Sequence, residues 1–376
     1  MASHLHRFKT LLADLERGEV LGVSDMAWLL EQRDPRDLAR LFAAARSVRQ
    51  RHFGSRVFLY GFLYFSTHCR NHCRFCRYRR ENFALKRYRK NREEILSAAI
   101  EMAAAGVHLI DLTMGEDPDI LEGNPSQLKE WVSMIRSVGK KTGLPVMISP
   151  GTVSGELLAD LVRAGVSWYA CYQETHNERL YATLRPEQEY HGRLAGKYRA
   201  RELGLLVEEG ILTGVGETAS DVADSIDFMR RFSVDQARVM SFVPHPGIPM
   251  SRAASADRET ERVTIAVMRL VMPDVLIPAS LDVDGLAGLA ARLDAGANVV
   301  TSIVPPGAGL SGVANFDLDI ANAGRSLAKV VPVLERCGLV TASADDYQAW
   351  VTRRQAMYGC SDGLGDLPAR EAVPCG

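Results

Sequence analysis

Three cysteines lie close together in the sequence, at Cys69, Cys73 and Cys76 in the segment YFSTHCRNHCRFC. Spacings of four and three residues let one curled loop bring three thiols to a common centre. Thiolates are soft ligands that suit zinc and iron–sulfur clusters. A structural zinc site needs a fourth ligand, for which His68 and His72 are the nearest candidates, whereas a four-iron cluster held by three cysteines leaves one iron open. The loop is therefore predicted to be a metal centre.

The remaining cysteines carry no comparable signal. Cys171 and Cys337 are expected to be buried apolar residues, and Cys360 and Cys375 are given no role. An odd total of seven in a chain of 376 residues argues against a disulfide framework. Five arginines surround the three-cysteine loop and either neutralise a negative cluster or form an ordinary solvated face. They are Arg70, Arg74, Arg77, Arg79 and Arg80.

A second group of polar residues stands inside apolar, strand-like segments. Asp111 and Arg238 each have apolar neighbours on both sides, and Ser280 and Asp282 share one parity near the end of another such segment. Because alternate side chains of a strand point to opposite faces, these four are expected to face inward. Buried charges need partners, so two carboxylates and one guanidinium match a zwitterionic amino acid that carries a second ammonium. An internal salt bridge, such as Arg238 with Asp282, is the alternative.

Strand-like and helical segments alternate from residue 56 onward. The expected strands cover 56–66, 107–114, 145–149, 167–173, 205–213, 236–243, 275–282 and 298–304. Apolar residues recur at helical spacing over 92–105, 126–138, 155–164, 191–203, 219–231, 257–271, 285–295 and 320–336. This order predicts an α/β fold, a (β/α)8 TIM-type barrel, with a doubly wound open sheet as the alternative. The cysteine loop then follows the first strand, at the end where barrel enzymes have their active sites.

Three regions are expected along the chain. Residues 1–55 show helical spacing and are predicted to form an N-terminal helical extension. Residues 56–345 form the barrel, and 346–376, rich in Gly, Asp, Pro and Ala towards the end, are predicted to be a loosely ordered tail.

Charge and hydropathy exclude several classes of function. The chain has 45 Lys and Arg against 46 Asp and Glu, a net charge of −1, which offers no general attraction to nucleic acid or to an anionic membrane. The start, MASHLHRFKT, lacks the apolar run of a signal peptide, and no stretch of about 20 apolar residues suggests a membrane span. We therefore expect a cytoplasmic protein that binds neither nucleic acid nor membrane.

The C-x3-C-x2-C motif, with Phe75 before its last cysteine, resembles the signature of the radical S-adenosylmethionine (SAM) enzymes. Two further segments resemble motifs of that superfamily: 114–117 (MGED) is similar to its Gly-Gly-Glu motif, and 210–217 (GILTGVGE) to the glycine-rich segment near the adenosyl group. The resemblance implies a [4Fe-4S] cluster on the three cysteines, with SAM on the open iron. The residues that would contact SAM are Met114, Gly115, Glu116, Asp117, Ser149, Glu174, Arg185, Gly214 and Gly216.

Within that superfamily, the segments VHLIDLTMGEDP, ACYQETH, EEGILTGVGE and RLDAGANVVTSIVPP resemble the methylornithine synthase family of lysine mutases. This resemblance covers about residues 38–340. It implies isomerisation of L-lysine to (3R)-3-methyl-D-ornithine by radical fragmentation and recombination, the first step of pyrrolysine biosynthesis. It also implies a low-potential electron donor such as a flavodoxin or ferredoxin.

The same resemblance implies roles for the four inward residues. Arg238 and Ser280 would bind the lysine carboxylate, Asp282 its α-ammonium and Asp111 its side-chain ammonium. Two other functions are kept as alternatives: a radical SAM maturase of the hydrogenase-maturation type with another substrate, and a non-catalytic zinc-binding barrel.

Overall fold

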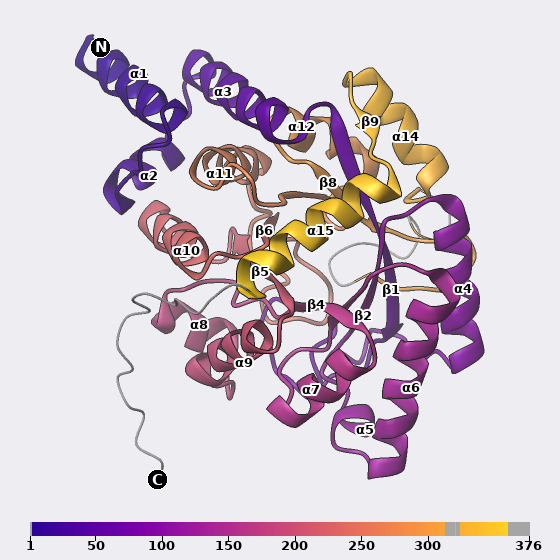
Figure 1. Ribbon diagram of the computed structural model, residues 1–376. Coiled ribbons are helices and arrows are strands. Elements are labelled where there is room, and N and C mark those ends of the chain that lie inside the picture. Colours follow the sequence, from indigo (N-terminus) through magenta and orange to yellow (C-terminus); the bar gives the residue numbers. More distant parts are fainter. Residues whose placement is uncertain (1, 313–319, 321–323, 360–376) are drawn as a thin grey trace.

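Eight parallel strands form the centre of the molecule, in the order β6-β5-β4-β3-β2-β1-β8-β7. The computed structural model describes residues 2–312, 320 and 324–359. Because the order follows the chain around a ring, with helices on the outside (Figure 1), the predicted α/β barrel is confirmed. The strands are β1 (Arg56–Ser66), β2 (Leu109–Met114), β3 (Val146–Ser149), β4 (Val166–Ala170), β5 (Leu206–Thr213), β6 (Gln236–Ser241), β7 (Pro278–Ser280) and β8 (Val299–Ile303).

The strands are buried along nearly their whole length, since the barrel interior lies on one face and the helices on the other. In β1 every residue after Arg56 is buried, and all of β2 and β5 are buried. When a parallel sheet is covered on both faces, its strands carry apolar side chains on both faces. A charged residue inside such a strand is therefore an exception that needs a structural reason.

The outer helices follow the strands as their apolar spacing predicts. Several begin at side-chain caps; the Asn91 side chain, for example, accepts a hydrogen bond from the backbone N–H of Glu94 at 2.9 Å. In the part of the chain that the structure describes, no helix is long and apolar enough to span a membrane. The helices are α4 (Arg92–Ala105), α5 (Pro118–Leu121), α6 (Pro125–Thr142), α7 (Gly155–Arg163), α8 (Glu178–Leu184), α9 (Tyr190–Glu202), α10 (Ala219–Phe232), α11 (Arg258–Val271), the 3-10 turn η1 (Gly285–Ala287), α12 (Leu289–Asp294) and α14 (Leu327–Arg336).

The barrel is only partly closed between its two end strands. Within the described residues, the single bridge between Gln236 and Leu276 joins the β6 side to the β7 side, at the amino end of both. β7 is shorter than the predicted 275–282: it begins at Pro278, which has no N–H to donate to a ladder, and its pairing with β8 ends at Ser280. The seam therefore leaves the carboxyl end of β6 without a strand partner on that side.

Three helices precede the barrel, as predicted for the first 55 residues: α1 (Ala2–Glu16), α2 (Val23–Leu30) and α3 (Pro35–Phe53). The Asp34 side chain caps α3 by accepting from the backbone N–H of Arg36 at 2.8 Å. α2 packs on α10 and α3 packs on α11 (Figure 1). The extension thus covers the helices next to the β6–β7 seam.

The C-terminal segment differs from the prediction of a loose tail after residue 345. A short strand, β9 (Val340–Thr341), pairs with the start of β1, and Ala344–Gly359 forms helix α15, drawn in yellow across the barrel in Figure 1. The Trp350 ring stacks on that of Trp168 with centroids 5.9 Å apart, and the Tyr347 hydroxyl lies 2.9 Å from that of Tyr60. Helix α15 therefore closes the amino end of the barrel, and 360–376 lie outside the described residues.

Candidate functional site

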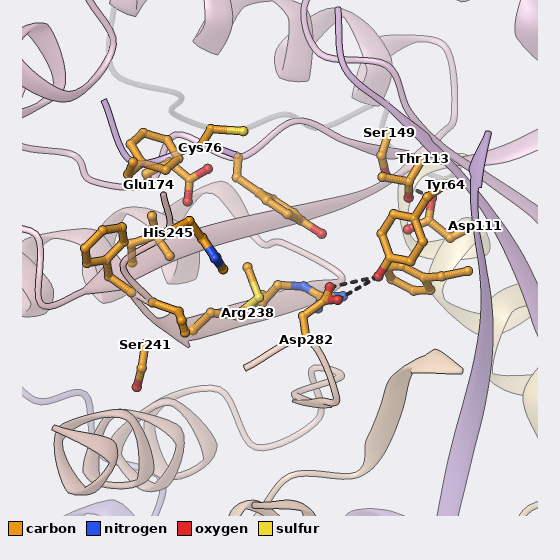
Figure 2. A pocket seen from close by; sticks show the side chains of 17 residues that line it. Tyr64, Cys76, Asp111, Thr113, Ser149, Glu174, Arg238, Ser241, His245 and Asp282 are labelled. Carbon is orange, nitrogen blue, oxygen red and sulfur yellow. Dashed lines mark hydrogen bonds between the residues drawn. The ribbon is translucent and has the colours of Figure 1, made fainter. Parts of the chain in front are cut away.

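A cavity of about 720 Å³ lies at the carboxyl ends of the strands. Figure 2 shows Cys76, Glu174 and His245 towards one side of the cavity and Asp111, Ser149 and Tyr64 towards the other. Arg238 and Asp282 lie between these two groups. The cavity therefore has two chemically different halves.

The three-cysteine loop forms part of the cavity wall. Cys76 lines the cavity, and Cys73 is buried beside it. The Cys73 sulfur accepts hydrogen bonds from Gln188 Nε2 at 3.1 Å and from Arg185 Nη1 at 3.4 Å. Donors of this kind stabilise a thiolate more than a thiol. Both donors lie in or after the α8 region, far from the loop in sequence.

The arginines within the loop have other partners. Arg70 pairs with Glu116 at 3.1 Å, and Arg79 pairs with Glu81 at 2.8 Å and donates to the carbonyl of Cys73 at 3.2 Å. These contacts hold the backbone of the loop. Of the side-chain contacts described, only the one from Arg185 brings a guanidinium to a cysteine sulfur.

The segment 114–117 packs behind the cysteine loop. A β-carbon on Gly115 would collide with the carbonyl oxygen of His68, so the close approach requires glycine. Glu116 accepts from Arg193 Nη1 at 3.2 Å and from the backbone N–H of Thr152 at 3.0 Å. These partners and Arg70 hold the pKa of Glu116 below its usual value despite burial. The segment therefore packs against the loop. None of the described residues that line the central cavity comes from 114–117, so a contact between this segment and SAM stays a prediction.

Asp117 takes part in the same scaffold. Its carboxylate accepts two hydrogen bonds from Arg89, at 2.6 and 2.9 Å, and one from the Ser66 hydroxyl at 2.6 Å. It also caps the short helix α5 through the backbone N–H of Asp119. Asp117 thus joins the end of β1 to the end of β2.

Glu174 occupies an unusual backbone position at the cavity. Its φ is 69°, in the left-handed region that a non-glycine residue seldom adopts. One carboxylate oxygen accepts from Arg185 Nη2 at 2.7 Å, and the other, Oε2, is buried without a hydrogen-bond partner among the described residues. Burial raises the pKa of Glu174, and Arg185 opposes that rise. Oε2 is an acceptor available to a ligand.

Asp111 points into the barrel as predicted, in the half of the cavity opposite Cys76. Its side chain is fully buried, and Oδ1 accepts from the Ser149 hydroxyl at 2.9 Å. Oδ2 has no hydrogen-bond partner in the described part of the chain. Burial, reinforced by the charge of Glu208, raises the pKa of Asp111 to about 7. The carboxylate is thus costly to ionise until a cation reaches it.

Arg238 also faces inward as predicted, but its partner is Glu208 and not Asp282. Arg238 Nε donates to Glu208 at 2.7 Å and Nη1 donates to the Thr301 hydroxyl at 3.0 Å. Nη2 is buried without a hydrogen-bond partner among the described residues. Glu208 also accepts from the Tyr172 hydroxyl at 2.8 Å. These contacts fix the guanidinium and leave one N–H edge for a ligand.

Asp282 is already neutralised by Arg325, whose Nη1 lies 2.6 Å from its Oδ1. It also accepts from the hydroxyls of Tyr64 at 2.8 and 2.9 Å and of Ser302 at 2.9 Å. Ser280 lies behind it: its hydroxyl accepts from the backbone N–H of Asp282 at 3.2 Å and is not part of the cavity wall described. A substrate contact by Ser280 stays a prediction.

The predicted glycines Gly214 and Gly216, and the four cysteines outside the loop, lie in different parts of the fold. Gly214 and Gly216 have φ of 84° and 107° in the turn after β5, whose N–H groups at 214 and 215 donate to Glu217. Cys171 is buried as expected, but Cys337, expected to be buried, is exposed, because it ends α14 at the surface. Cys360 and Cys375 lie outside the described residues.

The two leading alternatives for the cysteine loop differ in geometry. Among the described residues, no three His, Cys, Asp or Glu side chains are grouped to hold one metal ion. A cubane cluster needs no such group, because each cysteine binds a different iron. The three thiols, with donors to one sulfur and a cavity beside another, are a ligand set that fits an iron–sulfur cluster.

Comparison with known proteins gives a consistent family. A model described as the radical SAM superfamily matches residues 63–229. The 3-methylornithine synthase of Methanosarcina acetivorans is 41% identical over 331 residues, which cover 88% of this chain and 93% of that protein. The [FeFe] hydrogenase maturase subunit HydE of Thermotoga maritima is 32% identical, over 69% of this chain and 74% of that protein. A crystal structure of methylornithine synthase superposes with a TM-score of 0.85 at 40% identity, covering 90% and 99% of the two chains.

Proposed function

Because the chain belongs to the 3-methylornithine synthase family of the radical SAM superfamily, we propose that it isomerises L-lysine to 3-methylornithine as the first step of pyrrolysine biosynthesis. The observation that carries the proposal is the identity of 41% over 88% of the chain. Asp111 supports the choice of a diamino substrate, because it is a buried carboxylate with an unpartnered oxygen. The maturase relative has a lower identity of 32% and shorter coverage.

Cys69, Cys73 and Cys76 would hold a [4Fe-4S] cluster, and the cavity beside Cys76 would hold SAM. When bound, the cluster and SAM together supply the carbon-centred radical that removes a hydrogen atom from the substrate. Glu174 and Arg185 would orient SAM, which is supported by two contacts: Arg185 contacts both Cys73 and Glu174, and Glu174 presents a buried acceptor to the cavity. In this arrangement Gly115 and Glu116 would hold the loop in place next to the predicted SAM contacts of 114–117.

The other half of the cavity would hold lysine by its two ends. The free N–H edge of Arg238 suits the carboxylate, and the unpartnered oxygen of Asp111 suits the side-chain ammonium. Asp282 would receive the α-ammonium while it remains paired with Arg325. Because each end is held separately, both parts of the carbon skeleton stay bound while the connectivity between them changes.

Apolar residues complete the enclosure. Phe62, Leu212, Met240 and Phe242 line the cavity between the charged groups and exclude water from the reacting carbons. A lysine analogue without the distal ammonium would leave Asp111 unpaired in this apolar setting. The site is therefore expected to discriminate strongly against monoamino acids.

The proposal is tested by anaerobic reconstitution of the cluster, followed by incubation with SAM, a strong reductant and isotopically labelled lysine. We expect a product with the mass of lysine and a different chromatographic retention. An intact cluster that cleaves SAM without forming this isomer would favour the maturase-like alternative. One zinc per chain and no iron after anaerobic purification would favour the non-catalytic barrel.

A further inference from the structure

The cysteine loop has a second, outward-facing side. Cys69 lines a pocket of about 1,080 Å³ together with Arg80, Phe83 and Arg87, whereas Cys76 lines the central cavity. The loop thus separates the site of chemistry from this outer pocket. A protein bound at this outer pocket would therefore lie against the wall of the loop that contains Cys69.

Positive charge is concentrated around this outer pocket. Residues 67–92 contain ten Lys or Arg and one Glu, although the whole chain has a net charge of −1. Part of this charge is used internally: Arg89 pairs with Asp117 and Asp119, and Arg87 donates to backbone carbonyls, including that of Tyr78 at 2.8 Å. Arg80 and Lys86 are exposed and form no ion pair within the described residues. They leave an uncompensated positive surface.

An exposed aromatic residue stands at the same place. The Phe83 side chain lines the outer pocket and is 92% exposed, the most exposed of the large apolar residues described. An aromatic side chain flanked by cations is the composition of a protein-binding surface, in which the aromatic group becomes buried and the charges orient the partner. We call Arg80, Phe83 and Lys86 the basic surface.

We propose that the basic surface is the docking site of a small acidic electron-carrier protein with a low-potential flavin. This inference rests on the proposed function, which needs one electron from outside for each reduction of the cluster. The carrier loses one electron and the cluster gains one, with no group transferred. Docking at the pocket that contains Cys69 places the carrier at the outer wall of the loop and not in the central cavity.

Binding is measured first, because it does not depend on turnover. The probe is a purified flavodoxin, titrated calorimetrically into anaerobically reconstituted enzyme at 50 and 200 mM NaCl. We expect Phe83→Ala and the double variant Arg80→Glu/Lys86→Glu each to weaken binding at least about fivefold at 50 mM NaCl, with a weaker salt dependence in the double variant. The matched control is Arg136→Glu/Lys140→Glu, which reverses two exposed cations on α6 and is expected to change affinity less than twofold.

Electron delivery is measured second, by stopped-flow absorbance of the cluster. With flavodoxin hydroquinone, the rate of cluster reduction below saturation is expected to fall in parallel with affinity in both surface variants. With dithionite, which needs no docking, the rate is expected to match the unsubstituted enzyme. Iron content and dithionite-driven lysine turnover report separately on the proposed function, so the two inferences fail independently.

Three results would overturn the proposal. They are unchanged flavodoxin affinity in both surface variants, an equal loss in the α6 control, and loss of the dithionite-driven rate along with the flavodoxin-driven one. Tighter binding of a transfer RNA than of flavodoxin, abolished by Arg80→Glu/Lys86→Glu, would assign the basic surface to nucleic acid.

Discussion

Replacing Asp111 with Asn should stabilise the protein above neutral pH and, at the same time, disable it. The substitution retains the size of the side chain and its contact with Ser149 but removes a buried charge. In the folded protein the pKa of Asp111 is raised from 3.8 to about 7, mainly by burial. The folded state therefore holds a proton that the unfolded state has already lost between these two values.

The sign of the stability effect follows from that difference. As pH rises from about 4 to about 7, the unfolded state binds fewer protons than the folded state, so stability falls, and above pH 7 the loss is complete. A shift from 3.8 to about 7 corresponds to an upper bound of about 4 kcal/mol, at about 1.4 kcal/mol per pH unit. Asn carries no such cost. Asp111→Asn should therefore raise Tm by several degrees at pH 8 and by much less at pH 5.

Lysine binding should change in the opposite direction. An ammonium beside Asp111 offsets the cost of ionisation, and loss of one partner of a buried charge pair costs about 2–5 kcal/mol. We expect KM for lysine to rise at least about 30-fold in Asp111→Asn, because about 2 kcal/mol corresponds to that factor. In the unsubstituted enzyme, KM for lysine should fall as pH rises through about 7, where Asp111 ionises.

Thermal unfolding at the two pH values, with and without lysine, tests both effects on one preparation. The matched control is Asp227→Asn, since Arg230 and Arg231 hold the pKa of Asp227 below its usual value and this substitution should lower Tm at pH 8. Equal Tm for Asp111→Asn and the unsubstituted protein at pH 8 would refute the argument. So would lysine turnover with an unchanged KM.

Three further substitutions test other parts of the structure. Cys73→Ala should abolish iron incorporation on anaerobic reconstitution, measured by metal analysis, whereas Cys337→Ala at the surface should retain it. Glu208→Gln removes the charge beside Arg238 and should raise KM for lysine about tenfold (~1.4 kcal/mol) with SAM affinity unchanged; a parallel loss of SAM binding would contradict a local role. Trp350→Ala removes the ring stacked on the barrel end and should cost about 3 kcal/mol, seen as a lower Tm, with no loss of iron.

The strands were predictable because their signal is local. A buried parallel strand needs a run of apolar residues, and every predicted strand segment overlaps an observed one, although β4 begins at Val166, one residue before the predicted 167–173. β7 was predicted too long, because the length of a strand depends on its neighbours: Pro278 and the open seam beside β6 limit its pairing. The topology followed from eight strand–helix units, whereas the partial closure depends on contacts that no local pattern encodes.

The buried charges were predictable, but their partners were not. Asp111 and Arg238 each have apolar neighbours on the strand. Because those neighbours pack against the outer helices, the charged side chain between them is predicted to point into the barrel. The sequence does contain an indication of Glu208, which adjoins Glu209 in a buried strand. Neighbouring side chains of a strand point to opposite faces, so one of these two carboxylates must enter the barrel. Arg325 gave none, because it reaches Asp282 from 43 residues away along the chain.

The C-terminal helix lies in a segment for which composition predicts a loose tail. The glycine, proline and aspartate that indicate a tail lie after residue 359, whereas 346–359 belong to helix α15. Tyr347, Trp350 and Val351 nevertheless recur at helical spacing, and all three are buried against the barrel. Apolar periodicity was the better guide here, because burial of those rings stabilises the helix.

The charges around the cavity favour a diamino substrate on grounds independent of sequence similarity. In each of three carboxylate–guanidinium pairs, the negative and the positive charge cancel. Among the described residues of the cavity wall, Asp111 is the carboxylate that has no guanidinium partner. An ordinary zwitterionic amino acid adds no net charge and would leave Asp111 protonated or uncompensated, whereas lysine adds one positive charge at the distance of its side chain. The balanced pairs are Glu174–Arg185, Glu208–Arg238 and Asp282–Arg325. Under the proposed function, the single excess carboxylate would select for the second ammonium, while the pairs would orient groups that every amino acid shares.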